Sequence, residues 1–190
     1  MNLLSKTLVA ASLALVGSHA MAADYELDPA HTNARFYIDH FGTSTNHGGI
    51  YNVEGKLSFD AAAKTGSVDV SIPVAKMNSG NADFDGHLKH SDILNAEKYE
   101  TIRFVSTKWH FDGDKVTAVD GDLTILDKTH PVTLKATKFN CYENPMLKAT
   151  VCGGDFETKI DRSQWGVNYG IEHGFTKDVT IKIQVEAKKL

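Results

Sequence analysis

The segment Val179-Thr180-Ile181-Lys182-Ile183-Gln184-Val185, near the end of the chain, alternates strictly between apolar and polar side chains. Because successive side chains of a strand point to opposite faces of a sheet, this pattern predicts a strand with one apolar and one wet face. Half-buried strands of this kind are typical of antiparallel sheets. The same period recurs in seven other segments, with alternate positions at Phe36, Ile38 and His40; Tyr51, Val53, Gly55, Leu57 and Phe59; Val68, Val70, Ile72 and Val74; Ile102 and Phe104; Val119, Leu123 and Ile125; Val132, Leu134 and Ala136; and Phe156, Thr158 and Ile160.

Turn signals separate these segments and give them a regular spacing, at residues 60–66, 112–114, 127–131, 144–145 and 173–174. The pattern predicts one all-β domain, either an eight-stranded antiparallel barrel or a two-sheet sandwich. Residues 81–98 break the alternation, with apolar side chains at helix-like offsets, and we expect one or two short helices there. Alternation alone leaves barrel and sandwich open. A closed barrel can hold a small ligand, whereas a sandwich fills its core with its own side chains.

The composition excludes several classes of protein. The chain has 190 residues, with 20 Lys and Arg against 24 Asp and Glu, and a formal charge of −4. A non-specific nucleic-acid binder needs clustered basic side chains, and no basic run occurs. Two cysteines are too few for a disulfide-dense scaffold or for a four-thiolate zinc site.

Residues 1–22 are typical of a secretory signal peptide. Lys6 supplies positive charge, residues 8–16 are apolar, and Ala20-Met21-Ala22 places small residues at a cleavage point after Ala22. The apolar stretch is shorter than the ~20 residues that cross a bilayer, which disfavours a membrane anchor. We therefore expect a soluble mature domain over residues 23–190, exported to a bacterial periplasm and not stably inserted in a membrane.

That compartment favours a disulfide between Cys141 and Cys152, because periplasmic thiols are oxidised. Asn144-Pro145 lies between them and signals a turn, so the two cysteines would face each other across a hairpin. Their spacing is not the Cys-x-x-Cys of a redox catalyst, and we expect the bridge to be structural.

Several phrases in the mature chain form an ordered set. DPAHT at 28–32 precedes FYIDHFG at 36–42 and Gly48-Gly49; DGHLK at 85–89 precedes YETIRFVS at 99–106; GDLTI at 121–125 precedes THPVTL at 129–134; and IDRSQWG at 160–166 precedes the segment 179–186. In this order they resemble the YceI-like family of exported bacterial proteins along nearly all of the mature chain. By this resemblance, Gly48-Gly49 is the turn after the opening strand.

The resemblance implies a lipocalin-like antiparallel barrel with an elongated apolar cavity. It further implies a non-enzymatic carrier, without a catalytic cofactor, that binds a long polyisoprenoid lipid: an isoprenoid quinone such as ubiquinone, or a polyprenyl phosphate. The sequence departs from the family's pattern at Ile93-Leu94, where an aromatic pair is more common, at Asp127-Lys128, and at the two cysteines.

Candidate cavity-lining residues follow from the inward positions of the predicted strands, and the resemblance adds Trp165 as an aromatic cap for the barrel floor. The alternative is that the same side chains pack on one another as a dry core. The candidates are Phe36, Ile38, His40, Val53, Leu57, Phe59, Val68, Val70, Ile72, Ile102, Phe104, Leu123, Ile125, Leu134, Phe156, Ile160, Trp165, Ile181 and Ile183.

Two other functions stay open. His87 and His90 are three apart near Asp83 and Asp85, a spacing that suits a metal-dependent hydrolase. Such a site needs a third ligand and a general base, which the sequence does not reveal, and we expect no metal. We also expect no Ser-His-Asp catalysis, and we interpret Asp161-Arg162 as an arginine held by acids at a barrel end.

A barrel with a filled interior would instead be an interaction module. A homodimer would protect strand edges or a lipid mouth, and the sequence leaves the oligomeric state open.

Overall fold

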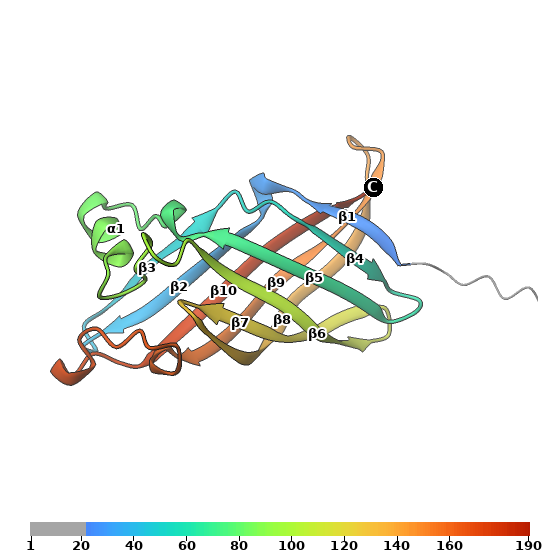
Figure 1. The fold of residues 1–190 in the computed structure, drawn as a ribbon. Coiled ribbons are helices and arrows are strands. Elements are labelled where there is room, and N and C mark those ends of the chain that lie inside the picture. Colours follow the sequence, from blue (N-terminus) through green and yellow to red (C-terminus); the bar gives the residue numbers. More distant parts are fainter. Residues whose placement is uncertain (1–21) are drawn as a thin grey trace, which may run out of the picture.

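The computed structural model describes residues 22–190, so the predicted signal peptide lies almost wholly outside the described residues and stays a prediction. Ten antiparallel strands form one sheet (Figure 1). The strands are β1 (Ala23–Leu27), β2 (Asn33–His40), β3 (Ser44–Tyr51), β4 (Lys56–Asp60), β5 (Thr65–Pro73), β6 (Thr101–Asp112), β7 (Lys115–Ile125), β8 (Lys128–Asn144), β9 (Ala149–Asp161) and β10 (Asp178–Lys189). The helices are α1 (Ala82–Lys89) and the 3-10 turns η1 (Pro29–His31), η2 (Val74–Lys76), η3 (Arg162–Trp165) and η4 (Ile171–His173).

Eight of the strands close into a barrel. They follow the order β1-β4-β5-β6-β7-β8-β9-β10, and β1 pairs with β10 to complete the circle. The structure thus confirms the predicted eight-stranded antiparallel barrel, and α1 confirms a short helix within 81–98. Within residues 22–190 no helix has both the length and the apolar character needed to cross a membrane.

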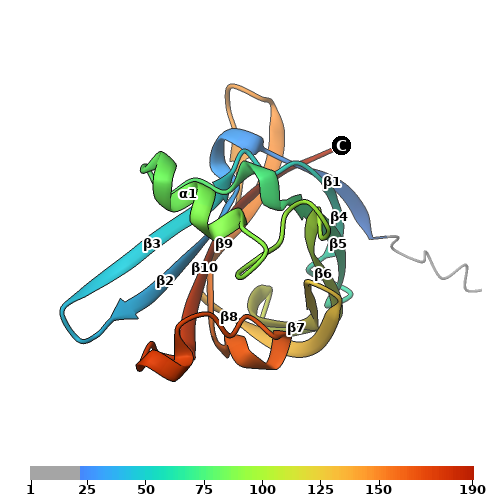
Figure 2. The same cartoon turned by 60° about the vertical axis from the view of Figure 1, so that its left-hand side comes forward.

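Two strands that follow one another in the sequence, β1 and β2, pair with the same edge of β10. Leu27 of β1 is opposite Ala187, and Phe36 of β2 is opposite Ile181. The chain turns between them at η1, where the side chain of Asp28 accepts a hydrogen bond from the Ala30 amide. Strand β2 then continues with β3 as a hairpin that projects beyond the barrel wall, at the end where α1 lies (Figure 2).

Two local predictions are wrong in this region. The segment 51–59 is not one strand, because β3 ends at Tyr51, Asn52 adopts a positive φ of 54°, and β4 begins at Lys56. Gly48-Gly49 is not a turn but lies within β3. A Cβ at Gly48 would come within 2.9 Å of the Phe36 ring, so the glycine lets β3 approach that ring closely.

The barrel wall is incomplete between β8 and β9. Their pairing extends from Lys135 and Glu157 toward the hairpin tip, and residues 128–134 have no partner on β9 in the described chain. Pro131 was expected in a turn but lies within this part of β8, which pairs with β7 and has a free edge toward β9, where a residue without an N–H is tolerated. The turn η3 lies beside the gap, and its Gln164 carbonyl oxygen is 3.0 Å from His130 Nε2.

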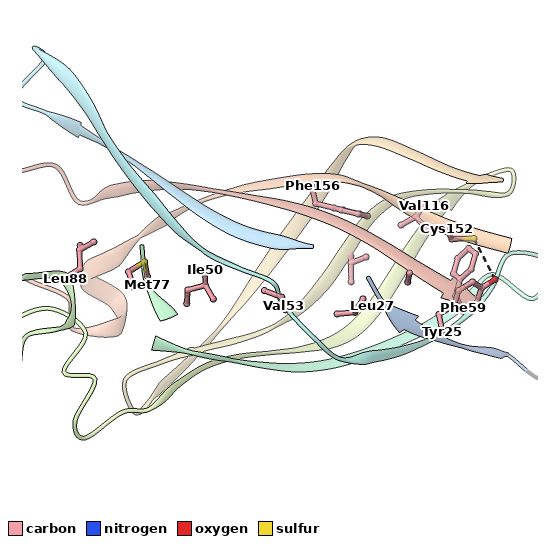
Figure 3. Packing of buried hydrophobic residues seen from close by; sticks show 12 residues of the cluster. Tyr25, Leu27, Ile50, Val53, Phe59, Met77, Leu88, Val116, Cys152 and Phe156 are labelled. Carbon is pink, nitrogen blue, oxygen red and sulfur yellow. Dashed lines mark hydrogen bonds between the residues drawn. The ribbon is translucent and has the colours of Figure 1, made fainter. Parts of the chain in front are cut away.

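Buried apolar side chains run along the whole length of the barrel (Figure 3). They extend from Leu88 and Met77 at the α1 end to Phe59 and Tyr25 at the other, which we call the packed end. There the centroid of the Phe59 ring lies 5.7–6.2 Å from the centroids of four other rings, which is the usual distance between packed aromatic rings. Aromatic side chains therefore fill this end of the barrel. Those rings belong to Tyr25, Trp109, Phe111 and Phe139.

The predicted disulfide between Cys141 and Cys152 is confirmed. The two residues are directly opposite in the β8–β9 ladder, and their sulfur atoms are bonded. The bridge therefore ties together a hairpin that extends past the packed end of the barrel (Figure 1).

The double substitution Cys141→Ala, Cys152→Ala should lower the free energy of unfolding by roughly 3 kcal/mol, because it removes a constraint on the unfolded chain. For a domain of this size the melting temperature should fall by roughly 6–12 °C, measurable by circular dichroism. An unchanged melting temperature in both variant and reduced protein would contradict this role.

Candidate ligand-binding cavity

A cavity of about 230 Å³ occupies the middle of the barrel, and we call it the inner cavity. Its exposed surface is almost wholly apolar. Alternate residues of each strand supply the wall, as the pleat requires, for example Val68, Val70 and Ile72 of β5. On β7, a Cβ at Gly121 would lie 2.3 Å from the Phe104 ring, so the glycine lets that ring approach the β7 backbone closely.

A second cavity of about 470 Å³ lies under α1 and the loop of residues 166–177, and we call it the mouth cavity. The two share wall residues and therefore adjoin along the barrel, and we call them together the passage. Together their volumes fall within the ~300–1,000 Å³ of ordinary ligand sites. The shared residues are Phe36, Met77, Ile102, Ile125 and Ile181.

All but two of the predicted lining residues lie on these walls. Phe59 instead fills the packed end. Trp165 is 1% exposed, and its Nε1 donates a hydrogen bond of 2.9 Å to the carbonyl oxygen of Leu123. It lies beside the gap between β8 and β9, 5.0 Å from the His130 ring, and not on the passage. Contact of the other side chains with a ligand stays a prediction.

Strand alternation did not identify the residues that cover the mouth cavity. Phe84 and Leu88 come from α1, Ile93 and Leu94 from the loop after it, and Tyr169 and Phe175 from the loop 166–177. The helix-like offsets of Phe84 and Leu88 are visible in the sequence, but nothing there shows where the helix packs.

Local hydrogen bonds fix α1 over the mouth. The side chain of Asn81 caps the helix by accepting from the Phe84 amide, as expected for Asn at this position. Asp85 accepts hydrogen bonds from the amide and the hydroxyl of Ser79, both 2.6 Å long. These bonds lower the pKa of the Asp85 carboxyl group and hold the loop before the helix to its first turn.

Arg162 holds the loop of residues 166–177 on the opposite side of the mouth cavity. Its partners are not the acidic side chains that the sequence suggested. Its guanidinium donates to the carbonyl oxygens of Thr176, Val167 and Tyr169 at 2.8–3.0 Å, so it is held by backbone and not by acids. Asp161 instead accepts from the amide and the hydroxyl of Ser163. Burial lowers the pKa of Arg162, and the nearby Asp161 charge partly offsets this shift.

Aromatic side chains surround the two histidines of the mouth cavity. The His40 ring lies edge-on to Phe41 and Phe175, at centroid distances of 5.2 and 5.1 Å. The His87 ring lies edge-on to Tyr169 at 4.7 Å. Neither imidazole makes a hydrogen bond within residues 22–190.

The structure does not bring His87 and His90 together as metal ligands. His87 lies on the cavity wall, whereas His90 Nδ1 is 3.2 Å from Asp92 on the exposed surface. In the part of the chain that the structure describes, no three His, Cys, Asp or Glu side chains form a group that could hold a metal ion.

Comparison with known proteins places this barrel in a family. The family model described as the YceI-like domain matches residues 25–187. This chain belongs to the YceI-like family. A UPF0312 protein of Pseudomonas putida is 32% identical to it over 188 residues, which cover 96% of this chain and 97% of the relative.

Solved structures of YceI-like proteins share the fold. The YCEI protein of Campylobacter jejuni is 25% identical, with a TM-score of 0.69 over 80% of this chain and 90% of its own. A polyisoprenoid binding domain from Saccharophagus degradans is 10% identical, with a TM-score of 0.61 over 90% and 100%. The YceI-like barrel therefore persists at low sequence identity.

Proposed function

We propose that this protein is a non-enzymatic carrier that holds one long-chain polyisoprenoid lipid along the axis of its barrel. The observation that carries the proposal is the passage formed by the adjoining inner and mouth cavities, whose walls are mostly apolar. No aspartate or glutamate lines either cavity, although acidic residues outnumber basic ones by 24 to 20 in the chain. The passage also argues against an interaction module with a filled interior.

The energetics suit a ligand of this class. Each methylene that moves from water into an apolar site gains about 0.8 kcal/mol, so a long hydrocarbon chain accumulates affinity along its length without polar contacts. The ligand is an isoprenoid quinone such as ubiquinone or a polyprenyl phosphate. Membership in the YceI-like family supports this class, as does the polyisoprenoid binding domain that shares the fold.

The carrier acts in a periplasm, after export and cleavage behind Ala22. Two observations support this location. Residues 1–22 have, in order, the positive charge, the apolar stretch and the small residues at a cleavage point that are typical of a signal peptide. The chain also forms a disulfide, a bond that persists in oxidising compartments.

Uptake of ubiquinone tests the proposal. Trp109 lines the inner cavity, so a quinone ring bound in the passage should quench tryptophan emission. We expect saturable, stoichiometric quenching by ubiquinone, and displacement of the quinone by a polyprenyl phosphate. If neither lipid binds a protein with an intact circular dichroism spectrum, the proposal is wrong.

A further inference from the structure

The turn between β2 and β3 holds a phenylalanine at a position that does not suit one. Phe41 and Gly42 are its central residues, with φ angles of 57° and 68°, and the Thr43 amide donates to the His40 carbonyl oxygen at 3.1 Å. Turns with positive φ at both central residues normally carry Asn, Asp or Gly at the first of them, because other side chains are strained there. Phe41 is nevertheless 53% exposed, so burial does little to offset this strain.

Two other aromatic side chains hold the Phe41 ring in place. The ring lies edge-on to Phe175 and to His40, at centroid distances of 4.8 and 5.2 Å. Phe175 belongs to the loop 166–177, which also carries Tyr169, a side chain that is 47% exposed. The turn and this loop lie side by side at one end of the barrel (Figure 1 and Figure 2). We call Phe41, Tyr169 and Phe175 the aromatic rim.

The aromatic rim borders the mouth cavity. Tyr169 and Phe175 line that cavity, whereas Phe41 lies on the surface, outside the linings of both cavities. The rim therefore joins the apolar interior of the barrel to exposed apolar surface. Charge beside it is mixed, since Glu172 Oε1 lies 3.5 Å from His173 Nε2 on the same loop. Contact with this surface would therefore depend on apolar area rather than on net charge.

We propose that the aromatic rim docks the barrel on the surface of a lipid bilayer, with the mouth cavity facing the membrane. The choice of a bilayer rests on the proposed function, because an isoprenoid tail that left the passage through water would expose its whole apolar surface. Aromatic side chains are favoured at the boundary between lipid headgroups and acyl chains. Attachment by three side chains is reversible, because interfacial affinity scales with the apolar area that is buried.

Tryptophan placed on the rim reports this contact directly. In Phe41→Trp, the added indole should shift its emission to shorter wavelengths with phosphatidylcholine vesicles, and brominated phosphatidylcholine should quench it. The unchanged protein supplies the background emission of Trp109 and Trp165. The matched control is Met146→Trp, because Met146 is 87% exposed at the tip of the β8–β9 hairpin, beyond the packed end. Emission from this position should not change.

Phe41→Asn separates docking from folding. Asparagine suits a positive φ, so the melting temperature should equal or exceed that of the unchanged protein. Binding to the vesicles should fall by about tenfold, because one aromatic ring no longer leaves water. Transfer of bound ubiquinone to the vesicles should slow by a similar factor, while the affinity for ubiquinone stays the same because Phe41 lies outside the passage. Met146→Asn, the matched control, should leave all of these quantities unchanged.

The outcomes separate docking from the proposed function. Quenching at neither position, or equal quenching at both, would overturn docking through the rim, and the carrier stands if ubiquinone still binds. A lower melting temperature in Phe41→Asn with unchanged vesicle binding would assign the ring to the fold. Self-association that Phe41→Asn abolishes, without vesicle binding, would assign the rim to a second copy of the chain. Docking by a protein that binds neither ubiquinone nor polyprenyl phosphate would refute the proposed function and leave the rim as a membrane contact.

Discussion

Replacing Ile181 with tryptophan is expected to weaken binding of a long isoprenoid by roughly a hundredfold or more. Ile181 lies in the first half of β10 and lines both cavities, so it stands where they adjoin. A larger ring there would bar the tail from the inner cavity. The methylenes left outside would each lose about 0.8 kcal/mol of transfer free energy. Competition for a bound apolar dye measures the loss, because the introduced tryptophan would itself change the quenching signal.

The control is Lys182→Trp, one residue further along the same strand. Lys182 points to the outer face, where its Nζ lies 5.5 Å from the centroid of the Tyr37 ring. This variant adds the same side chain to the outside of the wall and should bind ligand as the unchanged protein does. If Ile181→Trp keeps full affinity with a native circular dichroism spectrum, the ligand does not occupy the passage.

Trp165→Ala should have the largest effect on stability, lowering the free energy of unfolding by about 3–5 kcal/mol. The side chain is 1% exposed and packs with Leu123, Ile125 and Ile160 beside the gap between β8 and β9. Its loss would leave a void and remove the hydrogen bond that Nε1 donates to the Leu123 carbonyl oxygen. Urea unfolding followed by circular dichroism measures the change.

Trp165→Phe separates packing from hydrogen bonding at this position. Phenylalanine keeps much of the ring volume but cannot donate to Leu123, and its cost should be about 1–3 kcal/mol. A cost below 1 kcal/mol for Trp165→Ala would mean that η3 contributes little to closing the barrel wall, contrary to our account.

The strands that could be predicted are those with one face toward the cavity. In β5 every second side chain faces the passage and the others are exposed. In β10, Val179, Ile181, Ile183 and Val185 likewise face the passage, as their spacing in the sequence predicts. The break between β3 and β4 was missed because Val53 and Gly55 continue the alternation through residues that form no ladder. Strand β1 was missed because its five residues are too short to establish a period.

Contacts made through the backbone could not be predicted. Arg162 was assigned acidic partners because Asp161 precedes it, yet Asp161 ends β9 and accepts hydrogen bonds from Ser163, whereas Arg162 begins the turn η3. The carbonyl oxygens that hold Arg162 belong to a loop with no periodic pattern. The mouth cavity is formed by that loop and by α1, which packs over it. The sequence alone therefore does not show that Arg162, His40 and His87 line one cavity.

Whether the barrel holds an isoprenoid is tested by native mass spectrometry of the protein isolated from the envelope of its own cells. Lipids are extracted from the same sample. We expect one bound isoprenoid per chain, released on denaturation and identified in the extract as an isoprenoid quinone or a polyprenyl phosphate. Protein at its bare mass, with no isoprenoid in the extract and no uptake of added lipid, would contradict this expectation.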